Sequence, residues 1–258
     1  MTKLDSIKTA WESLAQQDAL SAILTDGSKS GGRWDLTAFM ETGEVEIETV
    51  MRHLVSINHI PDYVGTALDF GCGVGRLTQA LAQRFASCVG VDISQEMIRK
   101  ADAFNQHPHC RYMLNSDTPL PFADESFSFI YTNIVLQHMP QHLSASYLRE
   151  FVRLLTPGGV LVFGVQDSFK TPDVSSLLTR VRNTLHLRSR IRVLFRLGSG
   201  DMEMHCIPVQ VVQRAIGTAT ISDVQFTNSA EKDFNGRLAY LDQAPPSGYI
   251  SKQYCVVK

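Results

Sequence analysis

The chain has 258 residues, enough for one α/β domain with additions or for two small domains. Hydrophobic residues make up 44% and charged residues 19%, which is ordinary for a globular protein with a sizeable core. The formal net charge of -2 gives no overall electrostatic case for binding nucleic acid or an acidic membrane surface.

The five cysteines are scattered and form no C-x-x-C pair, so we expect neither structural disulfides nor a bound metal. The first residues lack the apolar stretch of a signal peptide. No apolar run reaches the roughly 18 residues that a membrane span requires. Together these features favour a reducing, cytoplasmic location.

Residues 1–63 are expected to form an N-terminal helical extension that packs on the core as a lid. Asp5 is a candidate N-cap for a first helix, and Thr37 for a second helix after a glycine- and serine-rich loop. Trp11 lies on the apolar stripe of the first helix, where anchoring the extension is its expected role. Trp34 either closes over a bound ligand or also acts as an anchor.

A strand, a glycine-rich turn and a helix are predicted next. The apolar run 64–70 indicates a buried strand, and Gly71, Gly73 and Gly75 follow at alternate positions. Apolar residues then recur at helical spacing through 76–85. Glycines allow a positive φ and a close approach of ligand to backbone, and a helix start offers unpaired N–H groups. The element predicts a nucleotide site; an ordinary strand-to-helix turn is the alternative.

Strand and helix patterns then alternate, which argues for a mostly parallel sheet covered on both faces. Further strands are expected at 88–92, 111–114, 127–132, 160–165, 222–226 and 250–257. Further helices are expected at 95–105, capped by Ser94, at 142–155 and at 209–216. The stretch of about 168–204 interrupts this rhythm with a helical, arginine-rich pattern at 175–197. We expect a cap insertion there, within a domain that spans 64–258.

Asp92 is the last residue of the second expected strand. A carboxylate at that place can accept hydrogen bonds from both ribose hydroxyls of a nucleoside. The alternative is that it helps to cap the helix that begins after Ser94. With the glycine turn upstream, the ribose role is favoured.

Four segments in order resemble motifs of one enzyme family. They are D-x-G-x-G-x-G at 69–75, the segment 115–127 with its Leu-Pro-Phe, the segment 131–139, and R-x-L-x-P-G-G at 153–159. The chain resembles the class I S-adenosylmethionine (SAM)-dependent methyltransferases of the methyltransferase type 11 kind. The resemblance implies a Rossmann-like, seven-stranded, mostly parallel sheet of order 3-2-1-4-5-7-6, with strand seven antiparallel.

The resemblance also implies a SAM site, with S-adenosylhomocysteine (SAH) as the product. The residues it implies in cofactor binding are Asp69, Gly71, Cys72, Gly73, Gly75, Arg76, Asp92, Ile93, Met97, Ser116, Asp117, Thr118, Asn133, Ile134, Val135 and His138. The family's acidic contact to adenine falls on Asp117 or Ser116, because the spacing to Leu120 is one residue short of the common form. A carboxylate is the better acceptor for the adenine amine, which favours Asp117.

A hydroxyl acceptor needs a base in addition to the activated methyl group, and histidine is the commonest choice. His138, in the segment 131–139, is the first candidate; the family's histidine there often only packs or bonds the backbone. His205 and Glu203, where the insertion rejoins the core, are the second candidates. Their alternative is a satisfied histidine beside a surface glutamate.

The predicted function is an enzyme, a SAM-dependent methyltransferase acting on a hydroxyl of a small molecule or glycan. N-methylation of a small molecule stays open, and a non-catalytic SAM-binding protein is an alternative from another class. The G-x-G-x-G spacing argues against a NAD-binding protein. An RNA or protein substrate is a further alternative, but residues 132–135 do not form the N-P-P-Y-type tetrapeptide expected for amino methylation of bases.

The arginine-rich stretch 175–197 is a solvated helix face, a cap that selects an anionic or glycosidic substrate or, last, a membrane-surface or nucleic-acid contact. A homodimer is one option for its apolar side, and no nucleic-acid partner is expected.

Overall fold

The structure is a computed structural model that describes residues 2–171 and 203–258. In these ranges the strands are β1 (Thr66–Phe70), β2 (Ser87–Asp92), β3 (Cys110–Leu114), β4 (Phe127–Thr132), β5 (Leu155–Lys170), β6 (Thr220–Thr227), β7 (Tyr240–Leu241) and β8 (Gly248–Val257). The helices are α1 (Lys3–Ile23), α2 (Leu36–Ser56), α3 (Arg76–Ala82), α4 (Gln95–Phe104), the 3₁₀ turn η1 (Leu136–His138), α5 (Gln141–Leu154) and α8 (Val209–Ile216).

The described strands form one sheet of order β3-β2-β1-β4-β5-β8-β6-β7. Strands β1 to β5 pair in parallel, and β8 runs antiparallel between β5 and β6. The predicted Rossmann-like order is therefore confirmed, with the final strand in the antiparallel seventh place. The prediction of seven strands missed β7, because a two-residue strand at a sheet edge shows no period in the sequence.

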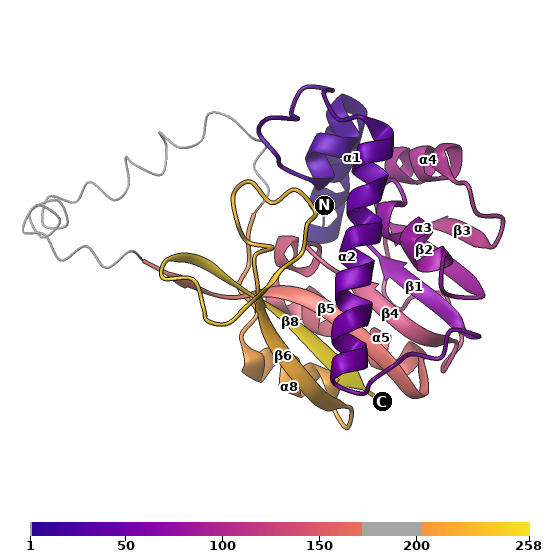
Figure 1. The fold of residues 1–258 in the computed structure, drawn as a ribbon, viewed down its shortest axis with the longest axis vertical. Coiled ribbons are helices and arrows are strands. Elements are labelled where there is room, and N and C mark those ends of the chain that lie inside the picture. Colours follow the sequence, from indigo (N-terminus) through magenta and orange to yellow (C-terminus); the bar gives the residue numbers. More distant parts are fainter. Residues whose placement is uncertain (1, 172–202) are drawn as a thin grey trace, which may run out of the picture.

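Helices cover both faces of the sheet (Figure 1). Because side chains alternate along a strand, Leu68 and Ile130 pack with α5 and α8 on one face. Ala67 and Phe129 pack with α2 and α3 on the other face. The sheet is thus packed against a hydrophobic core on each face, and this packing fixes the positions of the carboxyl ends of its parallel strands.

The caps of the first two helices differ from the expectation. In α1 the N-cap is Thr2, whose hydroxyl accepts from the Asp5 N–H at 3.2 Å while the Asp5 carboxylate accepts from the Thr2 N–H at 2.6 Å. Asp5 is thus the third helical residue of a capping box, not the cap. Helix α2 begins one residue before Thr37 and is capped by Asp35, which accepts from the Ala38 N–H at 2.9 Å.

Strand β5 is longer than its apolar run predicted. It continues to Lys170 because β8 pairs with it as far as Gly248. The expected start of the insertion, at residue 168, therefore falls inside this strand. The arginine-rich helical pattern at 175–197 lies outside the described residues.

Helix α1 is joined to the nucleotide-binding half of the sheet through Glu12. Its Oε2 accepts from the Ser94 hydroxyl at 2.7 Å and from the Glu96 N–H at 3.2 Å, at the start of α4. A carboxylate is favourable there because the first N–H groups of a helix lack partners. Further along, α1 bends at Asp18, whose backbone is non-helical.

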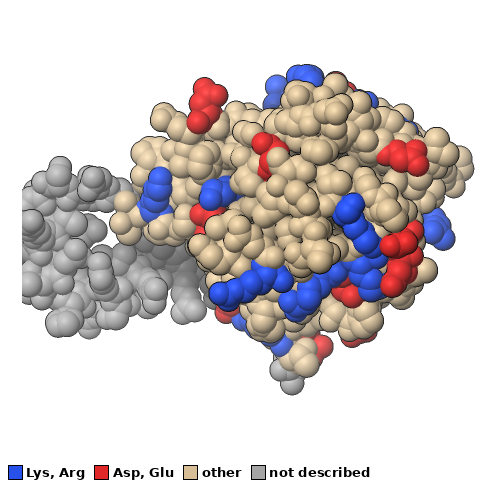
Figure 2. Space-filling model, turned by 90° about the horizontal axis from the view of Figure 1, so that it is seen from below, with Lys and Arg blue, Asp and Glu red and all other residues tan. Residues whose placement is uncertain are grey.

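On the described part of the face seen from below, Lys and Arg side chains form a band with Asp and Glu side chains beside it (Figure 2). That part of the surface carries mixed charge, not the uninterrupted positive potential on which nucleic-acid binding depends. Within residues 2–171 and 203–258, none of the helices combines the length and apolar character needed to cross a membrane.

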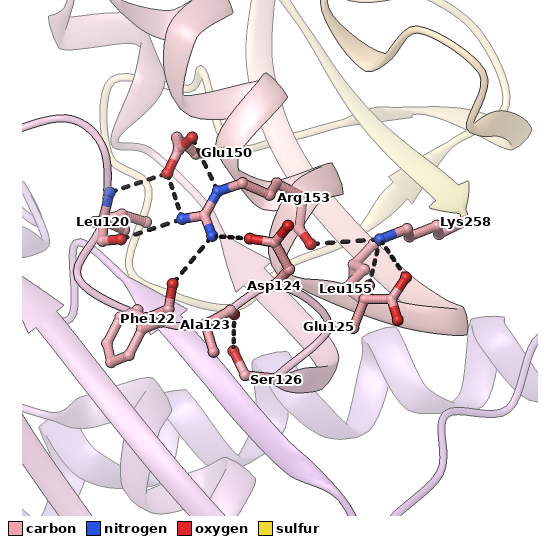
Figure 3. A network of polar contacts seen from close by, with 10 residues as sticks. All are labelled: Leu120, Phe122, Ala123, Asp124, Glu125, Ser126, Glu150, Arg153, Leu155 and Lys258. Carbon is pink, nitrogen blue, oxygen red and sulfur yellow. Dashed lines mark hydrogen bonds and ion pairs between the residues drawn. The ribbon is translucent and has the colours of Figure 1, made fainter.

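Arg153 fastens the loop after β3 to α5 (Figure 3). Its guanidinium donates to the carbonyls of Leu120 at 3.1 Å and Phe122 at 3.0 Å. It also pairs with Glu150 at 2.7 Å and Asp124 at 2.6 Å, and these carboxylates raise the pKa of Arg153. The planar fork serves partners in several directions at once, which a lysine cannot do. Arg153 is the first residue of the R-x-L-x-P-G-G segment, and in the structure it holds the 120–124 loop.

We expect Arg153→Lys to lower the free energy of unfolding by about 2 kcal/mol, because the bonds to two backbone carbonyls are lost. Urea titration followed by circular dichroism measures this. Arg149→Lys is the matched control, since Arg149 is an exposed arginine on the same helix that bonds Ser146. Equal effects of the two substitutions would contradict the assigned role.

Candidate functional site

A cavity of about 410 Å³ opens at the carboxyl ends of β1, β2 and β4. The volume is typical of a small-molecule site. The cavity also lies at the edge of the sheet where open α/β sheets bind ligands. Helix α1 forms one wall, and the segment from Ser229 to Phe234 forms another. Trp11 lines the cavity, whereas Trp34 packs edge-on against Phe39 at 5.4 Å between ring centroids. Trp11 thus lines the cavity as well as packing in the core of the extension, and Trp34 lies in that core, as in the anchoring alternative.

The glycine turn is shaped by hydrogen bonds to the neighbouring strand. The N–H groups of Gly71 and Cys72 donate to the Val91 carbonyl at 2.8 and 3.0 Å. Gly71 has φ +78°, and a Cβ there would collide with the side chain of Val135. At Gly73, with φ +52°, a Cβ would lie 2.5 Å from Ile23 of α1. The turn tolerates no side chain at either position, so the backbone itself is the cavity wall.

Asp92 faces the same wall from the end of β2. Its Oδ2 accepts from the Gly73 N–H at 2.8 Å and its Oδ1 from the Ser94 N–H at 2.9 Å. Each carboxylate oxygen has a second lone pair, so two ribose hydroxyls can still be accepted. Burial raises the pKa of Asp92, although these backbone bonds oppose the shift. The two roles that the sequence left open, capping and ribose binding, are compatible.

Most of the residues predicted for the cofactor line the cavity. From the turn, β2 and α4 these are Gly71, Cys72, Gly73, Arg76, Asp92, Ile93 and Met97. From the segment after β4 they are Asn133, Ile134, Val135 and His138. This lining suits a nucleoside with a polar tail. The backbone of the glycine turn, the Asp92 carboxylate and the apolar side chains of Ile93 and Met97 all belong to one cavity.

Five predicted residues lie elsewhere. Asp69 is buried below the turn, where it accepts from the Thr78 hydroxyl at 2.6 Å. Gly75 is the N-cap of α3 and does not reach the cavity. Ser116, Asp117 and Thr118 are also absent from the lining.

Asn115 lines the cavity in place of those three residues. Its N–H donates to the Asp92 carbonyl at 2.9 Å, and its side-chain amide donates to the Asp117 carbonyl at 2.7 Å. Its side-chain amide can serve the polar edge of a base. The short spacing before Leu120 was the sequence signal that this segment departs from the common form.

The sequence analysis missed Glu46, a fully buried glutamate of α2. Its Oε2 accepts from Arg76 Nη2 at 2.7 Å. Its Oε1 accepts from the Tyr131 hydroxyl and the Asn133 amide, both at 2.8 Å. Arg76 and Asn133 both line the cavity. Glu46 therefore positions two cavity residues from a helix outside the sheet.

We expect Glu46→Gln to destabilise the fold by about 3 kcal/mol, because Arg76 would stay buried without its countercharge. We also expect weaker binding of SAH, measured by calorimetry well below the melting temperature. Glu48→Gln is the control: Glu48 is on the same helix and pairs with Arg52 and Arg84 at the surface. Such surface pairs contribute about 0–1 kcal/mol. If Glu46→Gln binds SAH as the wild type does, Glu46 is not a positioning residue.

The chain crosses the cavity floor through a strained residue. Ile134 has φ +55°, which is rare for a β-branched side chain and costs about 1–3 kcal/mol. The Asn133 carboxamide oxygen accepts from the Ile134 N–H at 3.1 Å and holds this conformation. The turn directs the next residues, up to His138, along the cavity.

His138 lines the cavity, and its Nδ1 is buried with no hydrogen-bond partner among the described residues. Its ring meets Trp11 edge-on, with 5.5 Å between ring centroids. Burial lowers the pKa of His138 to about 4. The imidazole is therefore neutral at pH 7 and has a lone pair to accept a proton.

His205 and Glu203 do not line the cavity, whereas Met204 between them does. Glu203 is exposed, and the nearby Lys3 ammonium, 2.6 Å away, lowers the pKa of its carboxyl. The Nε2 of His205 lies 3.3 Å from the same carboxylate. The geometry thus separates these two catalytic candidates from the cavity and leaves His138 inside it.

The pKa of His138 makes stability depend on pH. Between pH 6.5 and about 4 the unfolded chain binds a proton at this residue and the folded chain does not, so stability falls as pH falls. Burial raises the pKa of Asp69 to about 7, so over much of this pH window the folded chain binds more protons at Asp69 than the unfolded chain does. This residue therefore raises stability as pH falls, opposite to His138. The difference between the wild type and His138→Phe isolates the histidine. We expect the variant's melting temperature to gain on the wild type as pH falls from 6.5 to 4; a constant gap would contradict the assigned pKa.

The fold and this site define a Rossmann-like nucleotide-binding domain. Residues 68–163 match the family model described as "Methyltransferase domain". The chain thus contains a class I SAM-dependent methyltransferase domain, and SAM is the cofactor of that class.

Individual relatives match over part of their length. A trans-aconitate 2-methyltransferase of Azoarcus sp. (strain BH72) is 37% identical over 114 residues, which are 43% of this chain and 43% of that protein. A malonyl-[acyl-carrier protein] O-methyltransferase of Pectobacterium atrosepticum is 31% identical over 117 residues, 45% of each chain. These matches span less than half of each relative's length.

The fold also resembles a solved structure over its whole length. Magnesium protoporphyrin IX methyltransferase from Synechocystis PCC 6803, solved with bound SAH, has a TM-score of 0.61 at 16% identity and covers 100% of both chains. At that identity the similarity concerns the fold.

Proposed function

We propose that the protein is a SAM-dependent methyltransferase that moves a methyl group to a hydroxyl of a small molecule. The observation that carries the proposal is the position of His138, whose unpartnered Nδ1 belongs to a residue of the same cavity as the glycine turn and Asp92. When bound, SAM supplies a methyl group already activated on its sulfonium sulfur. The protein then has to orient the acceptor, exclude water and take up a proton.

Each of these tasks has a candidate group. Gly71 and Gly73 hold the amino-acid end of the cofactor against bare backbone, and Asp92 holds the ribose. Helix α1 covers the cavity and limits the access of water. His138 is the candidate base, because it lines this cavity and its Nδ1 has no hydrogen-bond partner among the described residues.

The relatives support methyl transfer to oxygen without naming the acceptor. One relative is an O-methyltransferase by name, and another is named for trans-aconitate. N-methylation of a small molecule is the alternative within the same chemistry. A non-catalytic SAM-binding protein is the alternative from another class, and turnover of SAM to SAH distinguishes it. A NAD-binding protein is disfavoured by the family match.

The further parts of the proposal concern partners and location. The acceptor is a small molecule, with glycans included. All five cysteines are free, which agrees with the proposed cytoplasmic location. A homodimer and a substrate-selecting cap at 175–197 remain proposals on the sequence pattern alone.

His138→Phe tests the base. We expect kcat to fall by about 10²–10⁴-fold while SAH affinity is unchanged, because the ring volume stays and the proton acceptor is lost. SAH release measures the rate, and calorimetry measures the affinity. His205→Phe is the control, since His205 does not line the cavity. If only the control loses activity, the assignment of the base is wrong.

A further inference from the structure

We give the name acceptor pocket to the part of the cavity lining that adjoins His138. It comprises Ile7, Trp11, Met139, Tyr147, Gln166 and Met204. Trp11 contacts the His138 ring, and Tyr147 packs on Phe70 with 4.6 Å between ring centroids. Calling it the acceptor pocket rests on the proposed function.

Among the described residues, the lining of the acceptor pocket has no charged side chain. Among residues 2–171 and 203–258, the lysines and arginines that line the cavity are Arg76 and Lys232. Arg76 is neutralised by Glu46, and Lys232 belongs to the 229–234 segment rather than to the acceptor pocket. A carboxylate placed in the acceptor pocket would lose its hydration without gaining a countercharge, which is strongly unfavourable.

Besides the Tyr147 hydroxyl and the Trp11 indole N–H, this pocket contains the polar side chain of Gln166. It is fully buried at 0% exposure, and its Nε2 donates to Gln137 Oε1 at 2.9 Å. Its own Oε1 is buried and has no hydrogen-bond partner in the described ranges. Its backbone carbonyl accepts from the Ile207 N–H at 2.7 Å, so the residue is held from both sides.

An unpaired buried carbonyl oxygen is costly in a folded protein, and a ligand that donates a hydrogen bond removes the cost. Oxygen of an amide accepts from a hydroxyl or an N–H but repels a carboxylate. The pocket thus combines largely apolar walls with one buried acceptor atom that lacks a partner among the described residues.

We propose that the acceptor is an uncharged, mainly apolar molecule whose hydrogen-bond donor is received by Gln166 Oε1. Gln166 is then the residue that selects hydroxyl-bearing acceptors over carboxylates. A methyl ether at the position of that donor binds poorly, because it leaves the Gln166 oxygen unpaired.

The test is binding of matched probes to the full chain with saturating SAH, measured by calorimetry. The probes are dihydroxynaphthalene, its dimethyl ether, which has no hydroxyl donor, and hydroxynaphthoate, in which a carboxylate replaces one hydroxyl; all three share a ring system. We expect dihydroxynaphthalene to bind about tenfold more tightly than the ether and at least tenfold more tightly than hydroxynaphthoate.

Gln166→Leu removes the acceptor atom and keeps an apolar side chain. In this variant the preference for dihydroxynaphthalene over its ether should disappear, while SAH affinity stays unchanged. Gln141→Leu is the control, because Gln141 bonds the Cys206 carbonyl at 2.8 Å in the neighbouring segment but does not line the cavity. The comparison of the three probes in the wild type is decisive if the variant does not fold.

Three results overturn the proposal while SAH binding is intact. They are tighter binding of hydroxynaphthoate, equal binding of dihydroxynaphthalene and its ether, and binding of no neutral probe. An unaltered preference in a folded Gln166→Leu overturns it as well. Failure of the chain to bind SAH counts against the proposed function instead, so the two outcomes are separable.

Discussion

A glutamate carboxylate with no access to solvent holds the site together. Glu46 is brought to the sheet by α2, and it bonds an arginine from the glycine turn together with a tyrosine and an asparagine from β4 and its extension. A buried charge is stable only if its hydrogen-bonding capacity is met, and here both oxygens have partners. The same bonds that satisfy the charge fix the positions of two cavity side chains. The helical extension is thus part of the cofactor site and not only its cover.

The neighbouring strands add a second constraint. The turn after β1 takes its shape from the Val91 carbonyl and the Asp92 carboxylate of β2, so the pairing of two strands determines where backbone is exposed to a ligand. Ile134 shows the complementary feature after β4, where a strained backbone directs a segment across the cavity. The paired strands and the strained turn at Ile134 therefore determine the shape of the cavity beside the glycine turn. Helix α1 forms another wall and is held to the start of α4 by the bond from Ser94 to Glu12.

Local patterns predicted the parts of the fold that local physics determines. The strand at 127–132, the cap at Ser94 and the glycine turn were expected because alternation, capping and positive φ are visible within a few residues. Glu46 could not be predicted, because a glutamate within an acidic helical pattern is normally solvent-facing. Gln166 was missed for a related reason: its strand was expected to end at Val165, and only pairing with β8 carries it further. Asn115, two residues before Asp117, lines the cavity, and no pattern in the sequence distinguished it from its neighbours.

The proposed acceptor pocket takes Met139 and Tyr147 from the segment that the family match covers and its other walls from outside it. Residues 68–163 carry the family resemblance, whereas Ile7 and Trp11 precede that segment and Gln166 and Met204 follow it. The residues outside this match therefore serve both ends of the cavity, since Glu46 holds cofactor-site side chains while Trp11 and Gln166 line the proposed acceptor pocket. Two proteins that share the central segment can differ in what they methylate. Similarity over the central segment therefore indicates the type of reaction. The choice of acceptor depends also on residues before and after that segment.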